Sequence, residues 1–232
     1  MYKKFKKDLT VIVLCGGKGK RLYPLTKNIP KPLIKIKNKP ILKYIIDHLK
    51  SYEIKNFIIA TGYKHKLFTK FVKKLNVSDF NFRIVNSGIN VDIIKRIKDC
   101  SKKINKNILV CYGDTLVDLN INNLISFYNK NKNKIVFSSY TLKSQYGIIK
   151  IGKKGKVLSF NEKPDLGMYF NIGYFLFDKK NIIKMKKYTK FEKFLESRSI
   201  QKDLRSYIHY GKHITINTLS ELSDAKLNLK NI

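Results

Sequence analysis

The sequence predicts an α/β protein whose mainly parallel sheet carries helices on both faces. Short apolar, β-rich runs recur along the first 140 residues, and most gaps between them hold apolar residues at helical spacing. Such alternation requires crossover connections, which favour parallel strands buried between two layers of helices. A change of pattern after residue 146 indicates a small antiparallel insert in this sheet.

Six apolar runs are predicted to form the strands of the main sheet. They cover residues 9–14, 56–60, 82–86, 107–112, 134–140 and 173–178. Four helices are predicted around and between them, at residues 41–52, 66–75, 90–103 and 121–131. Pro40 suits the start of the first helix because its φ is already fixed near the helical value. The apolar residues of that helix are Ile41, Leu42, Ile45, Ile46 and Leu49, which fall on one side and predict a packing face.

The insert is predicted to be a β-hairpin. Residues 148–151 and 156–160 are rich in apolar residues, and they flank the turn Gly152-Lys-Lys-Gly155. We therefore expect antiparallel strands to interrupt the parallel series at this point.

Length and composition favour one cytoplasmic domain that spans residues 1–232. A chain of 232 residues with 43% hydrophobic and 12% aromatic content can bury one substantial core. It contains no run of about 18 apolar residues, so we expect no membrane span. The three cysteines, Cys15, Cys100 and Cys111, show no C-x-x-C spacing and are expected to be buried, reduced thiols.

The formal charge of +33 raises the alternative of a nucleic-acid-binding protein. However, the lysines are spread along the chain, and the aromatic residues fall mostly in apolar runs rather than between cations. We interpret most of the charge as solvated surface that attracts anionic substrates, with no specific nucleic-acid partner. A steep salt dependence of duplex binding would support the alternative.

The segment after the first predicted strand has the properties of a phosphate-binding loop. Gly16, Gly17 and Gly19 allow a tight bend that presents backbone N–H donors to phosphate oxygens. Arg21 offers a planar fork, and Lys31 projects from a stiff segment between two prolines. The loop lacks the Gly-Lys-Ser/Thr ending of a Walker A loop, and the dinucleotide pattern G-x-G-x-x-G does not occur. The residues expected around the nucleotide here are Leu14, Cys15, Gly16, Gly17, Lys18, Gly19, Lys20, Arg21 and Lys31.

Asp114 is the expected magnesium ligand. It follows the apolar run 107–112, so it should stand at the carboxyl end of a strand, with Gly113 giving close access. The alternative is a local turn or helix cap. Asp118 suits that capping role better, because it directly precedes the start of the next helix.

The run Leu14–Thr26, together with Pro30-Lys31-Pro32, resembles the signature of the sugar-1-phosphate nucleotidyltransferases. Later motifs agree in order, namely Tyr112-Gly-Asp-Thr115, Tyr146-Gly147, Phe160-Asn-Glu-Lys-Pro164 and Asn171-Ile-Gly173. The resemblance covers roughly residues 9–226 and implies a GT-A-like, Rossmann-like fold. It also implies a nucleotide-binding half, at about 9–120, and an acceptor-binding half, at about 121–226, to which the hairpin belongs.

The resemblance implies that an acceptor phosphate attacks the α-phosphorus of a nucleoside triphosphate and releases pyrophosphate. Arg21 would neutralise the pyrophosphate, Lys31 the α-phosphoryl oxygens, and Lys163 would orient the attacking phosphate. Asp114 would hold Mg²⁺. The other residues implied to contact the acceptor are Gly147, Glu162 and Asn171.

The second metal ligand departs from the family pattern. A late aspartate usually completes the metal site, and the matching position here is Asn217, a neutral and weaker ligand for Mg²⁺. Asp224 is the alternative, if its helix turns it inward. The missing aspartate also leaves open a catalytically silent nucleotide-binding subunit.

The sequence indicates only in part which nucleotide base and which phosphorylated acceptor the protein uses. The segment around Ser87 and Gly88 aligns best with glucose-1-phosphate cytidylyltransferases, although it is shortened and lacks their paired glycines. The sequence favours CTP, with GTP next, as in heptose-1-phosphate guanylyltransferases. The acceptor is a sugar 1-phosphate, phosphoglutamine or phosphocholine, and the product would be an activated precursor of surface polysaccharide. The oligomeric state stays open, a homodimer included.

Overall fold

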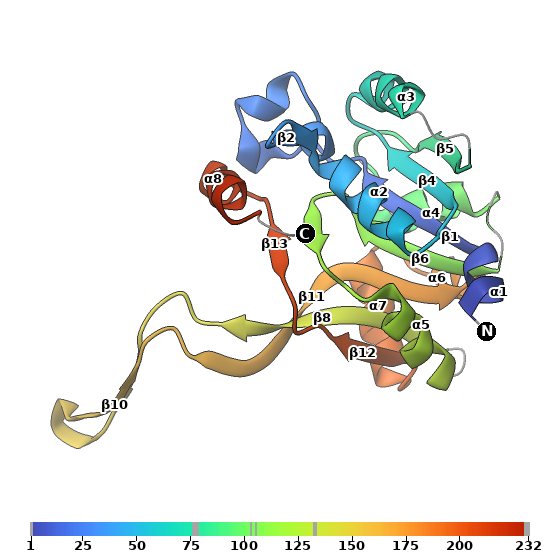
Figure 1. Cartoon of the computed structure of the whole chain (residues 1–232). Coiled ribbons are helices and arrows are strands. Elements are labelled where there is room, and N and C mark those ends of the chain that lie inside the picture. The colour runs from blue at the N-terminus through green and yellow to red at the C-terminus, as the bar shows by residue number, and fades with distance from the viewer. Residues whose placement is uncertain (1, 76–78, 103, 105, 132–133, 230–232) are drawn as a thin grey trace.

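The computed structural model describes residues 2–75, 79–102, 104, 106–131 and 134–229. Its centre is a seven-stranded sheet with the strand order β12-β8-β11-β6-β1-β4-β5 (Figure 1). These strands are β1 (Leu9–Cys15), β4 (Asn56–Thr61), β5 (Asn81–Asn86), β6 (Asn107–Tyr112), β8 (Ile135–Lys143), β11 (Asp165–Asp178) and β12 (Leu204–Ile208). All six predicted strands are present, β6 with the predicted bounds and the other five with shifted ends.

Helices and short ribbons complete the fold. The helices are α1 (Tyr2–Lys7), α2 (Ile41–Ser51), α3 (His65–Lys74), α4 (Ile93–Ser101), α5 (Ile121–Lys130), α6 (Lys180–Met185), α7 (Phe191–Ile200) and α8 (Leu219–Asn228). The two-stranded ribbons are β2 (Lys35–Ile36) with β3 (Lys39–Pro40), β7 (Thr115–Val117) with β13 (His213–Thr215), and β9 (Ile148–Ile151) with β10 (Val157–Asn161). The 3₁₀ turns of the described residues are η1 (Lys20–Leu22), η2 (Leu25–Lys27), η3 (Lys31–Leu33) and η4 (Lys153–Gly155).

The sheet is mixed but mainly parallel, as predicted. β1 pairs in parallel with both β4 and β6, β4 with β5, and β12 with β8. β11 runs antiparallel to β6 and to β8. Within the described sheet, β11 is therefore the strand that departs from the common direction.

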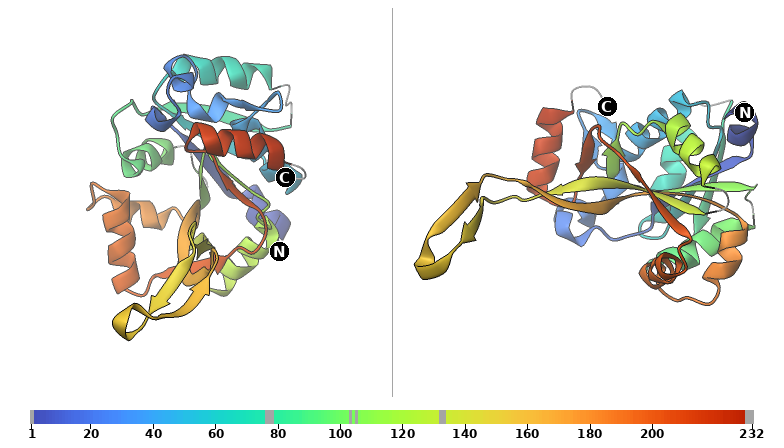
Figure 2. Two further views of the ribbon diagram at one scale, coloured as in Figure 1. Left: turned by 90° about the vertical axis from the view of Figure 1, so that its left-hand side faces the viewer. Right: turned by 90° about the horizontal axis from the view of Figure 1, so that it is seen from below.

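Alternating side chains of the strands divide the core into two layers. Leu9, Val11 and Val13 of β1 pack in a cluster with the apolar faces of α2, α3, α5 and α8. Ile12 points to the opposite face, where it joins a second cluster with α4, α6 and α7. Figure 2 shows the same arrangement, with helices on both faces of the sheet. This confirms the predicted three-layer architecture.

The order of the strands creates a crevice between β1 and β6. From β1 the chain moves outward through β4 to β5, and it then returns to the other side of β1 as β6. Such a reversal lets the loops after two neighbouring strands diverge, and ligands of open α/β sheets bind there. The glycine loop follows β1, and Asp114 follows β6. Both therefore lie at the same edge of the sheet.

The predicted hairpin is present as the ribbon β9–β10, which projects from the body of the protein (Figures 1 and 2). β9 and β10 pair with each other and with no strand of the main sheet. Their cross-strand pairs put Ile149, Ile151, Val157 and Phe160 on one face, with exposed fractions from 47% to 63%. The ribbon thus holds an apolar face that the rest of the described chain does not cover.

Three further predictions concern the cysteines, membrane-spanning helices and the role of Asp118. Cys15, Cys100 and Cys111 are buried and unpaired, as predicted. Over the described residues, none of the helices combines the length and the apolar character that crossing a bilayer demands. The prediction for Asp118 was wrong: the cap of α5 is Asn120, whose side chain accepts from the N–H of Asn123 at 3.0 Å. Asp118 instead accepts from the Lys212 N–H at 2.7 Å, because the chain before β13 passes beside it.

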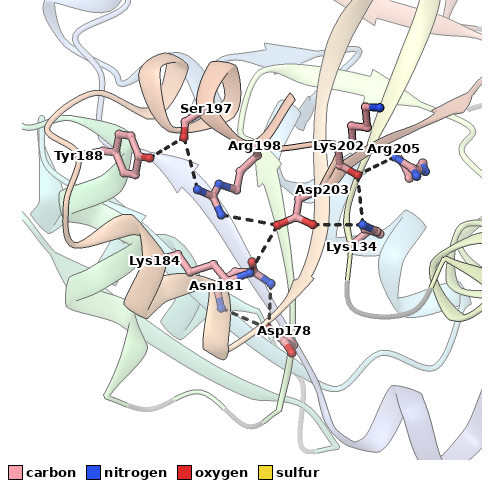
Figure 3. A network of polar contacts seen from close by, with 10 residues as sticks. All are labelled: Lys134, Asp178, Asn181, Lys184, Tyr188, Ser197, Arg198, Lys202, Asp203 and Arg205. Carbon is pink, nitrogen blue, oxygen red and sulfur yellow. Dashed lines mark hydrogen bonds and ion pairs between the residues drawn. The ribbon is translucent and has the colours of Figure 1, made fainter. Parts of the chain in front are cut away.

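One carboxylate joins the elements at the β12 edge of the sheet (Figure 3). Asp203 contacts three cations: Lys134 at 3.1 Å, Arg198 at 3.6 Å and Lys184 at 3.7 Å. The hydrogen bond from Lys134 lowers the pKa of Asp203, and the charges of Lys184 and Arg198 act in the same direction. Because Arg198 is buried, Asp203 compensates a charge that has little contact with water.

We predict that Asp203→Asn lowers the free energy of unfolding at pH 7 by about 1–3 kcal/mol, because it leaves buried Arg198 without its carboxylate. For a chain of this length the melting temperature should fall by about 2–10 °C. The lowered pKa means that the carboxylate stabilises the fold above its ordinary value of 3.8, and that this contribution disappears as pH falls through the lower folded value.

Calorimetry of wild type and variant from pH 7 to pH 3 checks this prediction. The difference between the two melting temperatures should shrink below pH 3.8. A difference that stays constant over the whole range would contradict the role given to Asp203.

Candidate functional site

A cavity of about 300 Å³ opens at the carboxyl edge of the sheet, at the crevice between β1 and β6. Its lining comes from the glycine loop, from the segment around Lys31, from the end of β6 and from the turn before α8. The lining residues are Leu14, Cys15, Gly17, Gly19, Lys20, Arg21, Lys31, Pro32, Gly113, Asp114 and Asn217. Ten of these eleven residues are among those predicted from the sequence, Pro32 being the addition.

The glycine loop is held against the segment that carries Lys31. Gly19 has φ +62°, which favours glycine, and a Cβ there would lie 3.1 Å from the Cβ of Lys31 and 3.1 Å from the Cγ2 of Thr26. The hydroxyl of Thr26 donates to the carbonyl of Gly19 at 3.1 Å. The loop and the Lys31 stem therefore pack as one unit, which fixes the wall of the cavity.

Gly113 brings the end of β6 close to the end of β1. Its N–H donates to the carbonyl of Leu14 at 3.1 Å. A Cβ at this position would lie 2.7 Å from that carbonyl oxygen and 2.8 Å from the Sγ of Cys15. Glycine is therefore required for the approach that sets Asp114 beside the loop.

Lys31 connects the two sides of the cavity. Its side chain is 10% exposed, and its Nζ donates to Asp114 Oδ2 at 2.7 Å and to Asn217 Oδ1 at 2.9 Å. The Nη2 of Arg21 donates to the same Asn217 oxygen at 3.0 Å. Two cations therefore converge on one carboxylate and one neutral amide, which leaves the site with a net positive charge suited to a polyanion.

Asn217 is positioned by the start of α8. Thr218 and Glu221 form a capping box, in which Glu221 N–H donates to Thr218 Oγ1 at 3.2 Å and Thr218 N–H donates to Glu221 Oε2 at 2.9 Å. The backbone N–H of Asn217 donates to the same carboxylate. Asp224, the alternative considered for the metal site, lines a different hollow with His213 and Glu221.

The donor set at the cavity fits Mg²⁺ only as a partner of phosphate. Among the described residues, no group of three or more His, Cys, Asp or Glu side chains could hold a metal ion by itself. The side-chain oxygens of the lining residues are those of Asp114 and Asn217, which share the Lys31 ammonium. Mg²⁺ is commonly held by one or two protein oxygens together with substrate phosphates and water, and this pair provides that much.

Cys15 lines the cavity but is not suited to act as a nucleophile. Burial raises the pKa of its thiol well above the usual value, and the nearby Cys111 and Asp114 act in the same direction. The thiol is therefore neutral at physiological pH, whereas a nucleophilic cysteine reacts as the thiolate.

The predicted acceptor residues are not brought to this cavity. Lys163 lies at the base of the projecting ribbon, 64% exposed, where its Nζ is 3.8 Å from Glu162. Gly147 directly precedes β9 at the same base, and a Cβ there would meet the ring of Phe160 at 2.7 Å. Asn171 is on β11, and its amide reaches the hydroxyl of Tyr112 at 3.5 Å. Their contact with an acceptor stays a prediction.

Four other predicted residues surround the site without lining the cavity. Gly16 is the buried first glycine of the loop, and Lys18 is exposed on it. Ser87 and Gly88 follow β5, where the N–H of Ser87 donates to the carbonyl of Thr61 at 3.1 Å. The sequence reasoning missed Arg96, which reaches Gly16 from α4. Its signal was a single arginine between the apolar residues Ile93, Ile94, Ile97 and Cys100 of a predicted packing helix.

Comparison with known proteins identifies relatives along nearly the whole chain. The model of the nucleotidyl transferase family matches residues 10–216. The D-glycero-alpha-D-manno-heptose 1-phosphate guanylyltransferase of Campylobacter jejuni is 30% identical over 163 residues, covering 67% of this chain and 69% of that protein. The probable glucose-1-phosphate cytidylyltransferase of Bacillus subtilis is 27% identical over 238 residues, covering 92% and 93% of the two chains.

A solved structure shows the same fold. The crystal structure of a Bacillus anthracis protein assigned as a glucose-1-phosphate thymidylyltransferase superposes with a TM-score of 0.76 at 21% identity. The match covers 97% of this chain and 96% of that protein. It confirms the predicted GT-A-like fold.

We predict that Gly113→Ala weakens nucleotide binding by at least about tenfold, because the added Cβ separates the ends of β1 and β6 and displaces Asp114. Overpacking of this kind should also cost about 1–3 kcal/mol of stability. Isothermal titration with CTP and GTP, at a temperature where both proteins are folded, measures the effect. Gly155→Ala serves as the control for adding a methyl group, because an added Cβ there meets open space on the ribbon, while the φ of +74° strains the variant in a way that position 113 does not. Equal nucleotide affinity of Gly113→Ala and wild type would contradict the prediction.

Proposed function

The chain belongs to the nucleotidyl transferase family, and on that premise we propose that it transfers a nucleoside monophosphate from CTP to a sugar 1-phosphate. The products are pyrophosphate and a nucleoside diphosphate sugar. The observation that carries the proposal is that Arg21 and Lys31 both donate to Asn217, and Lys31 also to Asp114, beside a glycine loop.

The cavity supports a reaction between two phosphates. An oxygen of the acceptor phosphate attacks the α-phosphorus, the bond between that phosphorus and the bridging oxygen of the β-phosphate breaks, and pyrophosphate departs. The attacking oxygen is already ionised near neutral pH, so no general base is required. Catalysis then consists of positioning and of neutralising charge on the transferred group.

The residues of the cavity divide these tasks. N–H groups of the glycine loop and the Arg21 guanidinium hold the β- and γ-phosphates, so that the leaving pyrophosphate is already neutralised. Lys31 extends from the same wall as the loop toward Asp114, and its ammonium can move from Asp114 to an α-phosphoryl oxygen. Lys163 and Glu162 meet the acceptor from the base of the ribbon, with Gly147 beside them and Asn171 on β11.

Asp114, with Asn217 as the weaker partner, would hold Mg²⁺ through their oxygens. When bound, the ion neutralises charge on the phosphates. In the structure the same two oxygens are held by the Lys31 ammonium.

The choice of CTP rests on the segment after β5 and on similarity to the cytidylyltransferase of Bacillus subtilis along nearly the whole chain. GTP is the second candidate. The specific observation that favours it is the 30% identity with the Campylobacter jejuni guanylyltransferase.

A pyrophosphate-release assay tests the proposal directly. CTP, GTP, UTP and ATP are each combined with glucose 1-phosphate, mannose 1-phosphate, a heptose 1-phosphate, phosphocholine and phosphoglutamine, with Mg²⁺ present. We expect release only when both substrates are present, and fastest with CTP and one sugar 1-phosphate. Binding of nucleotides without pyrophosphate release in any combination would favour the silent nucleotide-binding subunit and overturn the proposal.

We predict that Lys31→Ala lowers kcat by about 100- to 1000-fold, which is typical for the loss of one preorganised electrostatic group. The measurement is steady-state pyrophosphate release with the preferred pair of substrates. Lys35→Ala is the matched control, since Lys35 lies four residues further on and is exposed on β2. A rate unchanged from wild type would remove Lys31 from the mechanism.

We predict that Asn217→Asp increases the affinity of the nucleotide-free protein for Mn²⁺ by at least about tenfold, because it places a second carboxylate beside Asp114. Electron paramagnetic resonance of free Mn²⁺ measures this without any turnover. Asn120→Asp is the control, since it adds the same charge at the cap of α5, where aspartate is an equally good cap. Equal Mn²⁺ binding by both variants would show that position 217 is not beside the metal.

A further inference from the structure

Arg96 is a buried arginine that holds three separate backbone segments at the carboxyl edge of the sheet. It lies on α4 and is 5% exposed. Its Nη1 donates to the carbonyl of Thr61 at 2.8 Å. Its Nη2 donates to the carbonyls of Ile89 and Gly16, at 3.2 Å and 3.3 Å. The planar fork of arginine suits such a set of divergent acceptors, whereas one ammonium group would not reach them all in this way.

This charge is costly to bury. Burial lowers the pKa of Arg96, and none of the ion pairs formed by the described residues includes it. The carboxylates of Asp92 and Asp99 act on it from a longer range. An apolar side chain at this position would leave the carbonyls of Gly16, Thr61 and Ile89 without the donors of Arg96. The reason for an arginine here is therefore the set of carbonyls that it holds together.

The three carbonyls come from the segments that would seat the two ends of a nucleotide. Gly16 belongs to the glycine loop after β1, and Thr61 ends β4. Ile89 belongs to the segment after β5, which includes Ser87 and Gly88. The carboxyl ends of β1, β4 and β5 are neighbours in the sheet, so one side chain from α4 can reach all three.

The same three segments are packed tightly against each other. A Cβ on Gly62 would lie 2.1 Å from the carbonyl oxygen of Gly88 and 2.9 Å from that of Gly16. A Cβ on Gly16 would lie 1.9 Å from the Nη1 of Arg96. The guanidinium therefore lies directly behind the glycine loop, and it determines how far this loop stands from the segment after β5.

We propose that Arg96 is the positioning residue that sets the spacing between the phosphate-binding loop and the segment 87–91, and that this spacing determines which base the enzyme accepts. The inference rests on the proposed function, because it assigns the two segments to the phosphates and to the base. Arg96 touches neither substrate in this view. It acts through the carbonyls of Gly16 and Ile89, and its fixed positive charge adds to the potential of the loop.

The test compares Arg96→Gln, Arg96→Lys and wild type in the pyrophosphate-release assay with each of the four nucleoside triphosphates. For Arg96→Gln we expect the KM of the preferred nucleotide to rise at least tenfold. The ratio of kcat/KM between the preferred and the next nucleotide should fall at least tenfold, while the KM of the acceptor changes less than twofold. Arg96→Lys keeps the charge without the fork, so it should restore part of the nucleotide affinity but not the selectivity.

Arg198→Gln is the matched control, because Arg198 is buried to a similar degree but belongs to the Asp203 network at the β12 edge. It should lower the melting temperature and leave the selectivity ratio unchanged. Hydrogen–deuterium exchange of residues 87–91 in the unliganded proteins gives a readout that needs no turnover. Exchange should become faster in Arg96→Gln and should stay as in wild type in Arg198→Gln.

Two outcomes separate the inference from the proposed function. If wild type releases pyrophosphate with a clear base preference and Arg96→Gln keeps that preference, the inference is overturned and the function stands. If wild type releases no pyrophosphate with any nucleotide, the proposed function itself fails. If Arg96→Gln does not fold, the Arg96→Lys variant alone tests the inference. An unchanged selectivity between nucleotides in Arg96→Lys would then overturn the role given to the guanidinium fork.

Discussion

The contact of Lys31 with Asp114 and Asn217 is the interaction on which the site depends. It joins three segments that are far apart in the sequence: the turn after the glycine loop, the end of β6 and the start of α8. The ammonium is largely removed from water, so both oxygens are needed to compensate its desolvation. The Lys31 ammonium also holds the walls of the cavity at a fixed separation. The glycines at positions 19 and 113 serve the same arrangement, since each allows the backbone approach that the contact requires.

Most of the sheet could be predicted because its strands are short, apolar and separated by clear helical patterns. The predicted strands at 107–112 and 56–60 were recovered within one residue, as were three of the four helices. The segments after residue 178 were not predicted. α6 has only six residues, and α7 buries Phe191 and Phe194 without a regular apolar stripe. β12 is a strand at the end of the sheet with only partly buried residues, so its sequence lacks the continuous apolar character of a central strand.

The site was predictable where function depends on local sequence and not where it depends on tertiary placement. The glycine loop, Lys31 and Asp114 each belong to a short sequence motif, and the structure brings them together at one cavity. Asp118 was assigned to a cap from its position before a helix, but the chain before β13 approaches it from a distant part of the sequence. Arg96 was missed because its acceptors are main-chain carbonyls, which no sequence motif reveals. Lys163 lies at the base of a ribbon, and the local sequence does not indicate in which direction that ribbon projects.

The reversed direction of β11 has a consequence for how such a protein can diverge. β8 ends at the edge of the sheet that holds the cavity, and β11 begins at that same edge, so the ribbon between them leaves and returns at one place. Residues can be gained or lost at its tip without shifting the register of any strand in the core. The acceptor side can therefore change in length and composition while the nucleotide side stays constant. One scaffold could thereby serve a succession of different phosphorylated substrates with little cost to its stability.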